Sequence, residues 1–189
     1  MVEFTPWLLG ESHRQLLQVT IPAKGTLERV TTLGLGGLIE VNERLQIGST
    51  VTSHEKLYSP DGMLMIHSTG DKTMECNWLG TRITFNGESA SAIFEGFQRE
   101  DILEASAVWW ITSQPILGDE VLYYQPDVLT SGRSKRLTRF VGKEGELFLT
   151  ETLDVPTNNR TRQWLTPMGA LVRRQILSLD GTVQFDAQL

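Results

Sequence analysis

Ionisable and hydroxyl side chains fall on apolar faces of several predicted strands. Burying an ionisable group without a partner costs several kcal/mol, so such a group is paired, lies at a rim or takes part in function. Glu43, for example, shares its parity with the apolar residues of segment 39–45. The residues that we select on this ground as hydrogen-bond donors or as acid and base are His67, Glu104, Tyr123, Arg139 and Glu151.

Each of these residues also has a structural explanation. Arg139 and Glu151 both lie between apolar residues and could pair across neighbouring strands without any function. His67 could be a satisfied core or surface histidine, and Glu151 could lie at a solvent-exposed rim. In the catalytic hypothesis, Tyr123, His67 and Arg139 polarise a carbonyl group, and Glu104 or Glu151 supplies acid–base chemistry.

Aromatic and thioether side chains are the second notable feature. The chain has five tryptophans, and two of them are adjacent, so only one of that pair can face inward from a strand. Core packing is the ordinary explanation, and the alternative is a cavity with flat, adaptable apolar walls. The residues predicted to line such a cavity are Met63, Met65, Met74, Trp78, Trp109, Trp110 and Trp164.

Common cofactor and catalytic motifs are missing from the sequence. There is no Gly-x-Gly-x-x-Gly, Walker, His-Glu-x-x-His or Gly-x-Ser-x-Gly pattern, and the glycines of segment 34–37 favour a bend between strands. Three scattered histidines and one cysteine do not make a recognisable zinc set. We therefore expect no cofactor and no metal.

Charge and hydropathy limit the classes of molecule that we expect this protein to bind. The net charge is -6 and the isoelectric point about 5.1, which disfavours binding to nucleic acids. A basic group of arginines and a lysine at 133–139, with others at 160–174, is best explained as a solvated face. No run approaches the length of a membrane-spanning segment. We expect a cytoplasmic protein whose partner is a small hydrophobic molecule; the oligomeric state is not predicted.

Alternating apolar and polar residues, interrupted by turn residues about every ten positions, predict strands throughout the chain. Segment 88–105 is the best candidate for a short helix, and a second helix could begin at Thr5-Pro6. The fold class is therefore all-β: a single antiparallel barrel of about eight to ten strands, because closure hides the sheet edges. Residues 1–189 form one domain, in which residues 1–12 could close one end. A two-sheet sandwich is the alternative.

A family resemblance agrees with this architecture. The segment Leu57-Tyr58-Ser59-Pro60-Asp61-Gly62-Met63 resembles the strand-turn-strand signature of the intracellular lipocalin-like domain family of the calycin superfamily. Segments 118–121, 139–150, 160–162 and 171–174 are similar to its later hairpins, so the resemblance covers roughly residues 57 to 175. The family usually opens with Gly-x-Trp, whereas here Trp7 precedes Gly10. The resemblance implies a barrel with an internal cavity and transfers no catalytic residue.

Two functions from different classes follow from such a cavity. The first is a cofactor-independent cyclase or isomerase of natural-product biosynthesis, acting on an apolar polyene or polyketide-like substrate, because orientation alone can supply roughly 7–11 kcal/mol of a barrier. The alternative is a non-catalytic carrier of a small hydrophobic ligand. A chromophore lyase that uses Cys76 comes third. A buried carboxylate with a raised pKa beside arginine or tyrosine would favour the enzyme, and a wholly apolar cavity would favour the carrier.

Overall fold

The computed structural model of the chain describes residues 12–58, 64–70, 72–77, 80–85, 88–92, 116–127, 132–167 and 170–189. Within these ranges the chain consists of β-strands, their connections and one three-residue 3-10 turn, η1 (Leu35–Gly37), without any α-helix. The prediction of an all-β, antiparallel protein is thereby confirmed.

The strands follow one another along the chain in two runs. The first run contains β1 (Ser12–Ile21), β2 (Gly25–Leu33), β3 (Ile39–Ile47), β4 (Thr50–Tyr58), β5 (Leu64–Thr69), β6 (Lys72–Asn77), β7 (Gly80–Phe85) and β8 (Glu88–Ala92). The second run contains β9 (Glu120–Asp127), β10 (Gly132–Glu144), β11 (Leu147–Asp154), β12 (Arg160–Leu165), β13 (Leu171–Leu177) and β14 (Val183–Gln188).

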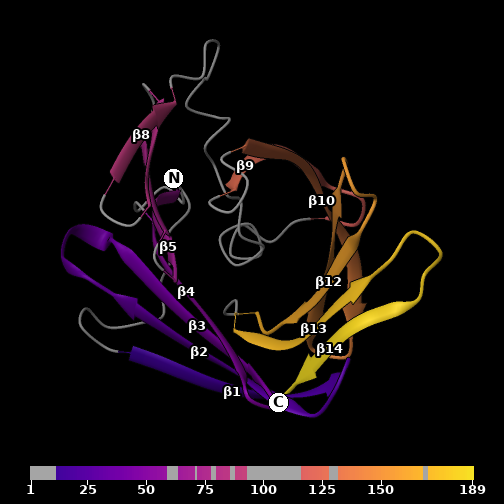
Figure 1. Cartoon of the computed structure of the whole chain (residues 1–189). Helices are drawn as coiled ribbons and strands as arrows, with labels where there is room; N and C mark the ends of the chain where they lie inside the picture. Colours follow the sequence, from indigo (N-terminus) through magenta and orange to yellow (C-terminus); the bar gives the residue numbers. More distant parts are fainter. Residues whose placement is uncertain are drawn as a thin grey trace.

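The fourteen strands found in the described residues belong to one antiparallel sheet, in which the strands of each run pair with their neighbours along the chain. The two runs are joined where β1 pairs with β14, which gives the order β8-β7-β6-β5-β4-β3-β2-β1-β14-β13-β12-β11-β10-β9. The sheet bends strongly, so that β4 and β5 on one side face β10 and β12 on the other (Figure 1). It therefore has a concave inner face and a convex outer face.

Local irregularities in the strands account for part of this bend. The register shifts in the β1–β14, β4–β5, β10–β11, β12–β13 and β13–β14 pairs. A β-bulge of this kind bends a strand and increases its twist. At the β10–β11 shift, Gly142 adopts a φ of 142°, a backbone conformation that residues with a side chain rarely take.

The hydrophobic core lies on the concave face where the two runs meet. Leu17, Leu165, Leu171 and Ala187 are at most 1% exposed, and they pack in one cluster of buried residues. The other members of this cluster are Val19, Leu27, Ile39, Val41, Tyr58, Phe140 and Phe148. Because β1 to β4 and β10 to β14 all contribute, the core holds the two runs of the chain together.

Several details of the predicted architecture need correction. Within the described residues the sheet has fourteen strands, more than the expected eight to ten. Its two edge strands there, β8 and β9, are not paired with each other, so the sheet is not closed into a barrel. Residues 88–92 form a strand where a helix was expected, because their pairing with β7 supplies the backbone hydrogen bonds. The remainder of that segment, the turn at 59–62 and residues 1–11 lie outside the described residues. The glycines at 34–37 do form a bend between β2 and β3, as predicted.

Candidate functional site

Polar side chains interrupt the apolar inner face on β2, β3 and β4. Arg29, Glu43 and His54 occupy one row of the sheet, since Arg29 pairs in register with Glu43 and Glu43 with His54. The inner positions before Arg29 and Glu43 on their own strands are Leu27 and Val41, both buried in the core. Because β2 and β3 are antiparallel, the row lies between two rows that contain core residues, with Leu27 on one side and Val41 on the other.

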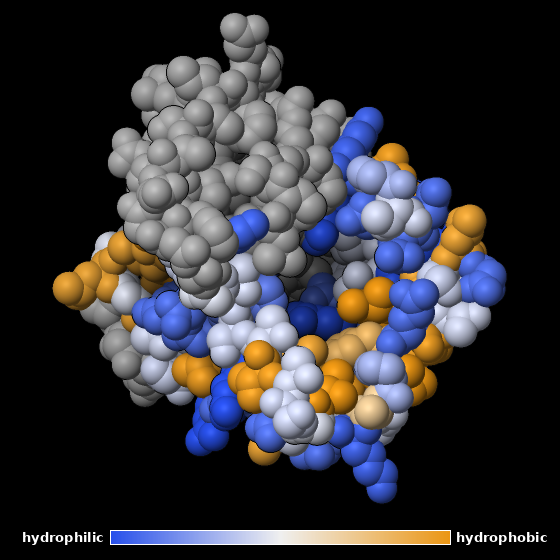
Figure 2. All heavy atoms as spheres, viewed as in Figure 1, coloured by the Kyte–Doolittle hydropathy of each residue, from blue (hydrophilic) through white to orange (hydrophobic). Residues whose placement is uncertain are grey.

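Arg174 on β13 reaches the same place from the opposite side of the molecule. Its NH2 group donates to Oε1 of Glu43 over 2.8 Å, and NH1 of Arg29 lies 3.5 Å from the same oxygen. Strands β14, β1 and β2 separate β13 from β3 in the sheet, so these side chains meet only across the concave face. Figure 2 shows a hollow at the centre of the molecule, with hydrophilic residues at its floor.

Glu43 is ionised in this setting. Its side chain is 14% exposed, and burial alone would raise its pKa. The positive charges of Arg174, Arg29 and Lys56, with the hydrogen bond from Arg174, outweigh burial and hold the pKa of Glu43 well below its ordinary value. The carboxylate therefore acts as a fixed negative charge and not as a proton donor near neutral pH.

Two histidines lie next to this carboxylate. Nδ1 of His54 and Nε2 of His67 are 3.1 Å apart and share a hydrogen bond, and their ring centroids are 5.3 Å apart. Lys56 completes the group, because it pairs in register with His67. We call Arg29, Glu43, His54, Lys56, His67 and Arg174 the inner polar cluster.

The protonation of His54 is set by the same surroundings. Burial lowers the pKa of His54 below its ordinary value of 6.5, and Lys56 and Arg174 lower it further, against an opposing contribution from Glu43. The imidazole of His54 is therefore neutral at pH 7. A neutral imidazole that shares one hydrogen bond keeps the capacity to accept a proton.

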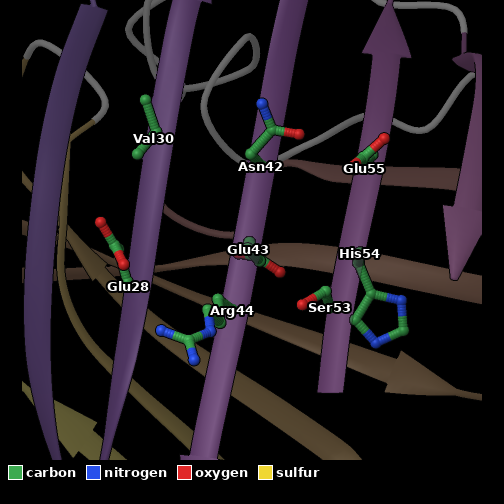
Figure 3. A pocket seen from close by; sticks show the side chains of 8 residues that line it. All are labelled: Glu28, Val30, Asn42, Glu43, Arg44, Ser53, His54 and Glu55. Carbon is green, nitrogen blue, oxygen red and sulfur yellow. The ribbon is translucent and has the colours of Figure 1, made fainter. Parts of the chain in front are cut away.

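The opposite face of the same three strands carries a depression of about 240 Å³. Figure 3 shows its lining side chains in two rows, in agreement with the register of β2, β3 and β4. One row is Val30, Asn42 and Glu55, and the other is Glu28, Arg44 and Ser53; Glu43 and His54 also contribute to the lining. Arg44, Ser53 and Glu55 are exposed, so this depression opens to solvent on the outer face.

The residues that the sequence selected fall into separate places. His67 is 7% exposed and belongs to the inner polar cluster. Met74 pairs in register with His67, and Met65 is half-buried at the β4–β5 register shift. Tyr123 pairs in register with Arg136 on β10. Met63, Trp78, Glu104, Trp109 and Trp110 lie outside the described residues.

Arg139, Glu151 and Trp164 lie on the outer face, away from His67. The side chain of Arg139 is 57% exposed and pairs with Glu120, and Glu151 accepts a hydrogen bond from Arg162 over 2.8 Å. Arg139 and Glu151 are register partners, but each forms its ion pair with a different residue. Trp164 donates to Glu144 over 2.8 Å and stacks under the guanidinium of Arg173.

Sequence reasoning did not find most of the inner polar cluster. It placed Glu43 on an apolar face and selected His67, but it assigned Arg174 to a solvated surface and passed over Arg29, His54 and Lys56. The parity of Arg29 with Leu27 was the available signal for one of them. The partnership of Arg174 with Glu43 depends on the curvature of the sheet, and the local sequence does not show that curvature.

The described residues contain no group of three or more histidine, cysteine, aspartate or glutamate side chains placed to hold a metal ion. In the same part of the chain, no helix has the length and apolarity needed to cross a membrane. Comparison of the chain with protein-family models, with curated proteins and with solved structures found no significant match.

Proposed function

We propose that this protein binds a small, largely apolar molecule on the concave face of its sheet, with the polar end of that molecule at the inner polar cluster. The observation that carries the proposal is the pairing of Glu43 with Arg174 across the concave face, in a row that has core residues on both sides. The ligand's apolar body would lie against the core residues, and its polar group would replace water beside the charged ones.

The contribution of the inner polar cluster to the stability of the fold does not explain why the cluster is present. Taking charges out of water costs free energy that a buried ion pair barely recovers, and apolar replacements of similar volume are often neutral or stabilising. The cluster instead gives a concave, mostly apolar surface a few fixed polar groups, and this combination is typical of small-molecule sites. The hydrophilic floor of the central hollow is consistent with this placement (Figure 2).

The lipocalin-like relationship is part of the same proposal. What supports it is the strand order, in which neighbours along the chain are neighbours in one strongly curved antiparallel sheet. Closed barrels of eight or more strands leave room inside for side chains and one small ligand, and the concave face of this open sheet is the corresponding surface. Fold-level analogy of this kind favours a carrier or a cofactor-free enzyme without choosing between them.

A cofactor-free isomerase or cyclase is the second candidate, and the His54–His67 pair is the observation that favours it. A neutral imidazole could take a proton from a carbon next to a ligand carbonyl and return it to another carbon, so that no atoms are gained or lost. Arg29 and Arg174 would stabilise the negative charge that develops on the carbonyl oxygen. In this version His54 takes the acid–base role that the sequence had given to Glu104 or Glu151.

Native mass spectrometry of the purified protein tests the binding proposal. We expect a non-covalent small molecule bound to the 21.2 kDa chain, or uptake of added 1-pyrenebutanol, with either signal lost on denaturation. The variant Arg174→Met should weaken this binding, whereas Arg14→Met, which removes an exposed outer-face charge, should not. A wild-type protein that carries no small molecule and takes up no 1-pyrenebutanol would contradict the proposal.

A catalytic role would show itself in a different measurement. If the isomerase or cyclase version holds, the identified ligand is converted by the wild type, and His54→Gln lowers turnover much more than it lowers binding. A ligand that is bound and recovered unchanged after prolonged incubation favours the carrier.

A further inference from the structure

Arg29 is a buried cation, and its contact with a charged group in the described residues is a long one. The residue is 9% exposed, and its inner position on β2 places it in the row with Glu43. A guanidinium group has five N–H donors. Within the part of the chain that the structure describes, the contact of Arg29 with a charged group is that with Glu43.

That contact is long, and the acceptor is already engaged. NH1 of Arg29 lies 3.5 Å from Oε1 of Glu43, beyond the usual 2.7–3.2 Å of an N–H···O hydrogen bond. The same oxygen accepts the 2.8 Å hydrogen bond from Arg174. Two guanidinium groups therefore converge on one carboxylate, and Arg174 has the better geometry.

We propose that Arg29 binds a carboxylate group of the ligand, so that the molecule held on the concave face is an apolar carboxylic acid. This inference rests on the proposed function and specifies the chemical class of the ligand. A planar guanidinium matches a carboxylate in a two-point hydrogen-bonded pair, which is stronger than a bond between neutral groups. A second carboxylate beside Glu43 would also balance the charges of Arg29 and Arg174.

The position of Arg29 fits this role. It follows Leu27 on the inner face of β2, so a carboxylate on Arg29 would leave the rest of the ligand beside the apolar core. Arg174 would continue to hold Glu43, and the fixed negative charge of Glu43 would keep the guanidinium of Arg29 in place for the incoming group. The row therefore has one arginine for the protein's own carboxylate and one for the ligand's.

Two pairs of fluorescent probes test the inference, each pair consisting of an acid and the alcohol of the same skeleton. They are 1-pyrenebutyric acid with 1-pyrenebutanol, and 11-(dansylamino)undecanoic acid with 11-(dansylamino)undecan-1-ol. In at least one pair we expect the wild type to bind the acid about tenfold or more tightly than the alcohol, as one charge-assisted hydrogen-bonded contact implies. In Arg29→Met we expect that ratio to fall to about one, with the affinity for the alcohol little changed.

Matched variants keep the test specific. Arg44→Met removes an exposed arginine from the outer face of the adjacent strand and should leave the acid-to-alcohol ratio unchanged. Circular dichroism confirms that Arg29→Met is folded, and Arg29→Lys should keep part of the acid preference because it keeps the charge without the planar fork. Equal affinities for acid and alcohol in the wild type, or an acid preference that survives in Arg29→Met, overturn the inference while the binding proposal stands. If none of the four probes binds, the inference fails, and the binding proposal fails with it when the purified protein also carries no small molecule.

Discussion

Arg174 on β13 donates a 2.8 Å hydrogen bond to Glu43 on β3, although three strands separate β13 from β3 in the sheet. This contact spans the concave face and joins the two runs of the chain at a charged row that has core residues on both sides. The same two residues belong to the inner polar cluster of the candidate site. The effect of this hydrogen bond on the free energy of unfolding and its effect on ligand binding can therefore be measured separately.

Removal of the buried carboxylate should destabilise the protein strongly. Glu43→Gln leaves two inner arginines without their counter-charge, and breaking a buried pair in this way costs about 3–5 kcal/mol. Glu28→Gln is the matched control, because Glu28 pairs with an arginine whose side chain is 68% exposed, and the expected loss is about 1 kcal/mol or less. Denaturant unfolding of both variants measures the two losses in the free energy of unfolding. Equal losses would show that the inner ion pair contributes no more to stability than a surface ion pair.

The free energy of unfolding should fall as the pH decreases from about 6.5. The pKa of His54 lies below 6.5 in the folded protein, so the unfolded chain binds more protons over this range and is favoured by acid. The slope from this one residue is at most about 1.4 kcal/mol per pH unit. Denaturant titrations at pH 7.5, 6.5 and 5.5 should show a smaller slope in His54→Gln, and an unchanged slope would rule out this assignment.

A second loss of stability is expected at lower pH. Hydrogen bonds from Arg173 lower the pKa of Asp186, against the opposing effect of burial, and the pKa of Glu43 is lowered as well. The stability that these carboxylates contribute is present above their ordinary pKa values of 3.8 and 4.5, and it is lost as the pH falls below them. Asp186→Asn should cost about 1.5–3 kcal/mol at pH 7, because Asp186 accepts three hydrogen bonds. Glu120→Gln, at an exposed pair, should cost far less.

The shared core should make the two runs of the chain unfold together. Leu17 on β1 is fully buried in the cluster that also contains Leu165 of β12, and Leu17→Ala should cost about 2–5 kcal/mol. Its neighbour Leu16 is 48% exposed on the other face of β1, so Leu16→Ala should change stability by about 0.5 kcal/mol or less. Two separate unfolding transitions in the wild type, or similar losses in the two variants, would contradict a single core.

The features that depend on residues close together along the chain could be predicted from the sequence. Alternation on residues 39–45 placed Glu43 with Ile39 and Val41, and the structure has all three at inner positions of β3. Glycine at the β10–β11 turn and at 34–37 likewise marked the connections correctly. Period-two patterns and turn residues are local signals, so they predict strands and turns without any knowledge of the curvature of the whole sheet.

The features that the sequence could not supply depend on how far the sheet curves. Arg174 alternates with outward residues on β13, and local pattern does not distinguish a solvated arginine from one that crosses the concave face to Glu43. His54 and His67 are thirteen residues apart on neighbouring strands, and their contact depends on the β4–β5 register. Bulges set both the register and the curvature, and single-residue shifts of this kind have no strong sequence signature.

Nuclear magnetic resonance of the arginine side chains tests the central claim most directly. In a titration with 1-pyrenebutyric acid, binding to the concave face predicts that the Nε–Hε signals of Arg29 and Arg174 shift in proportion to occupancy, while that of Arg44 on the outer face stays in place. Assignment comes from the single variants Arg29→Lys, Arg174→Lys and Arg44→Lys. Shifts confined to Arg44 and the outer depression, with Arg29 and Arg174 unmoved at saturation, would contradict the account.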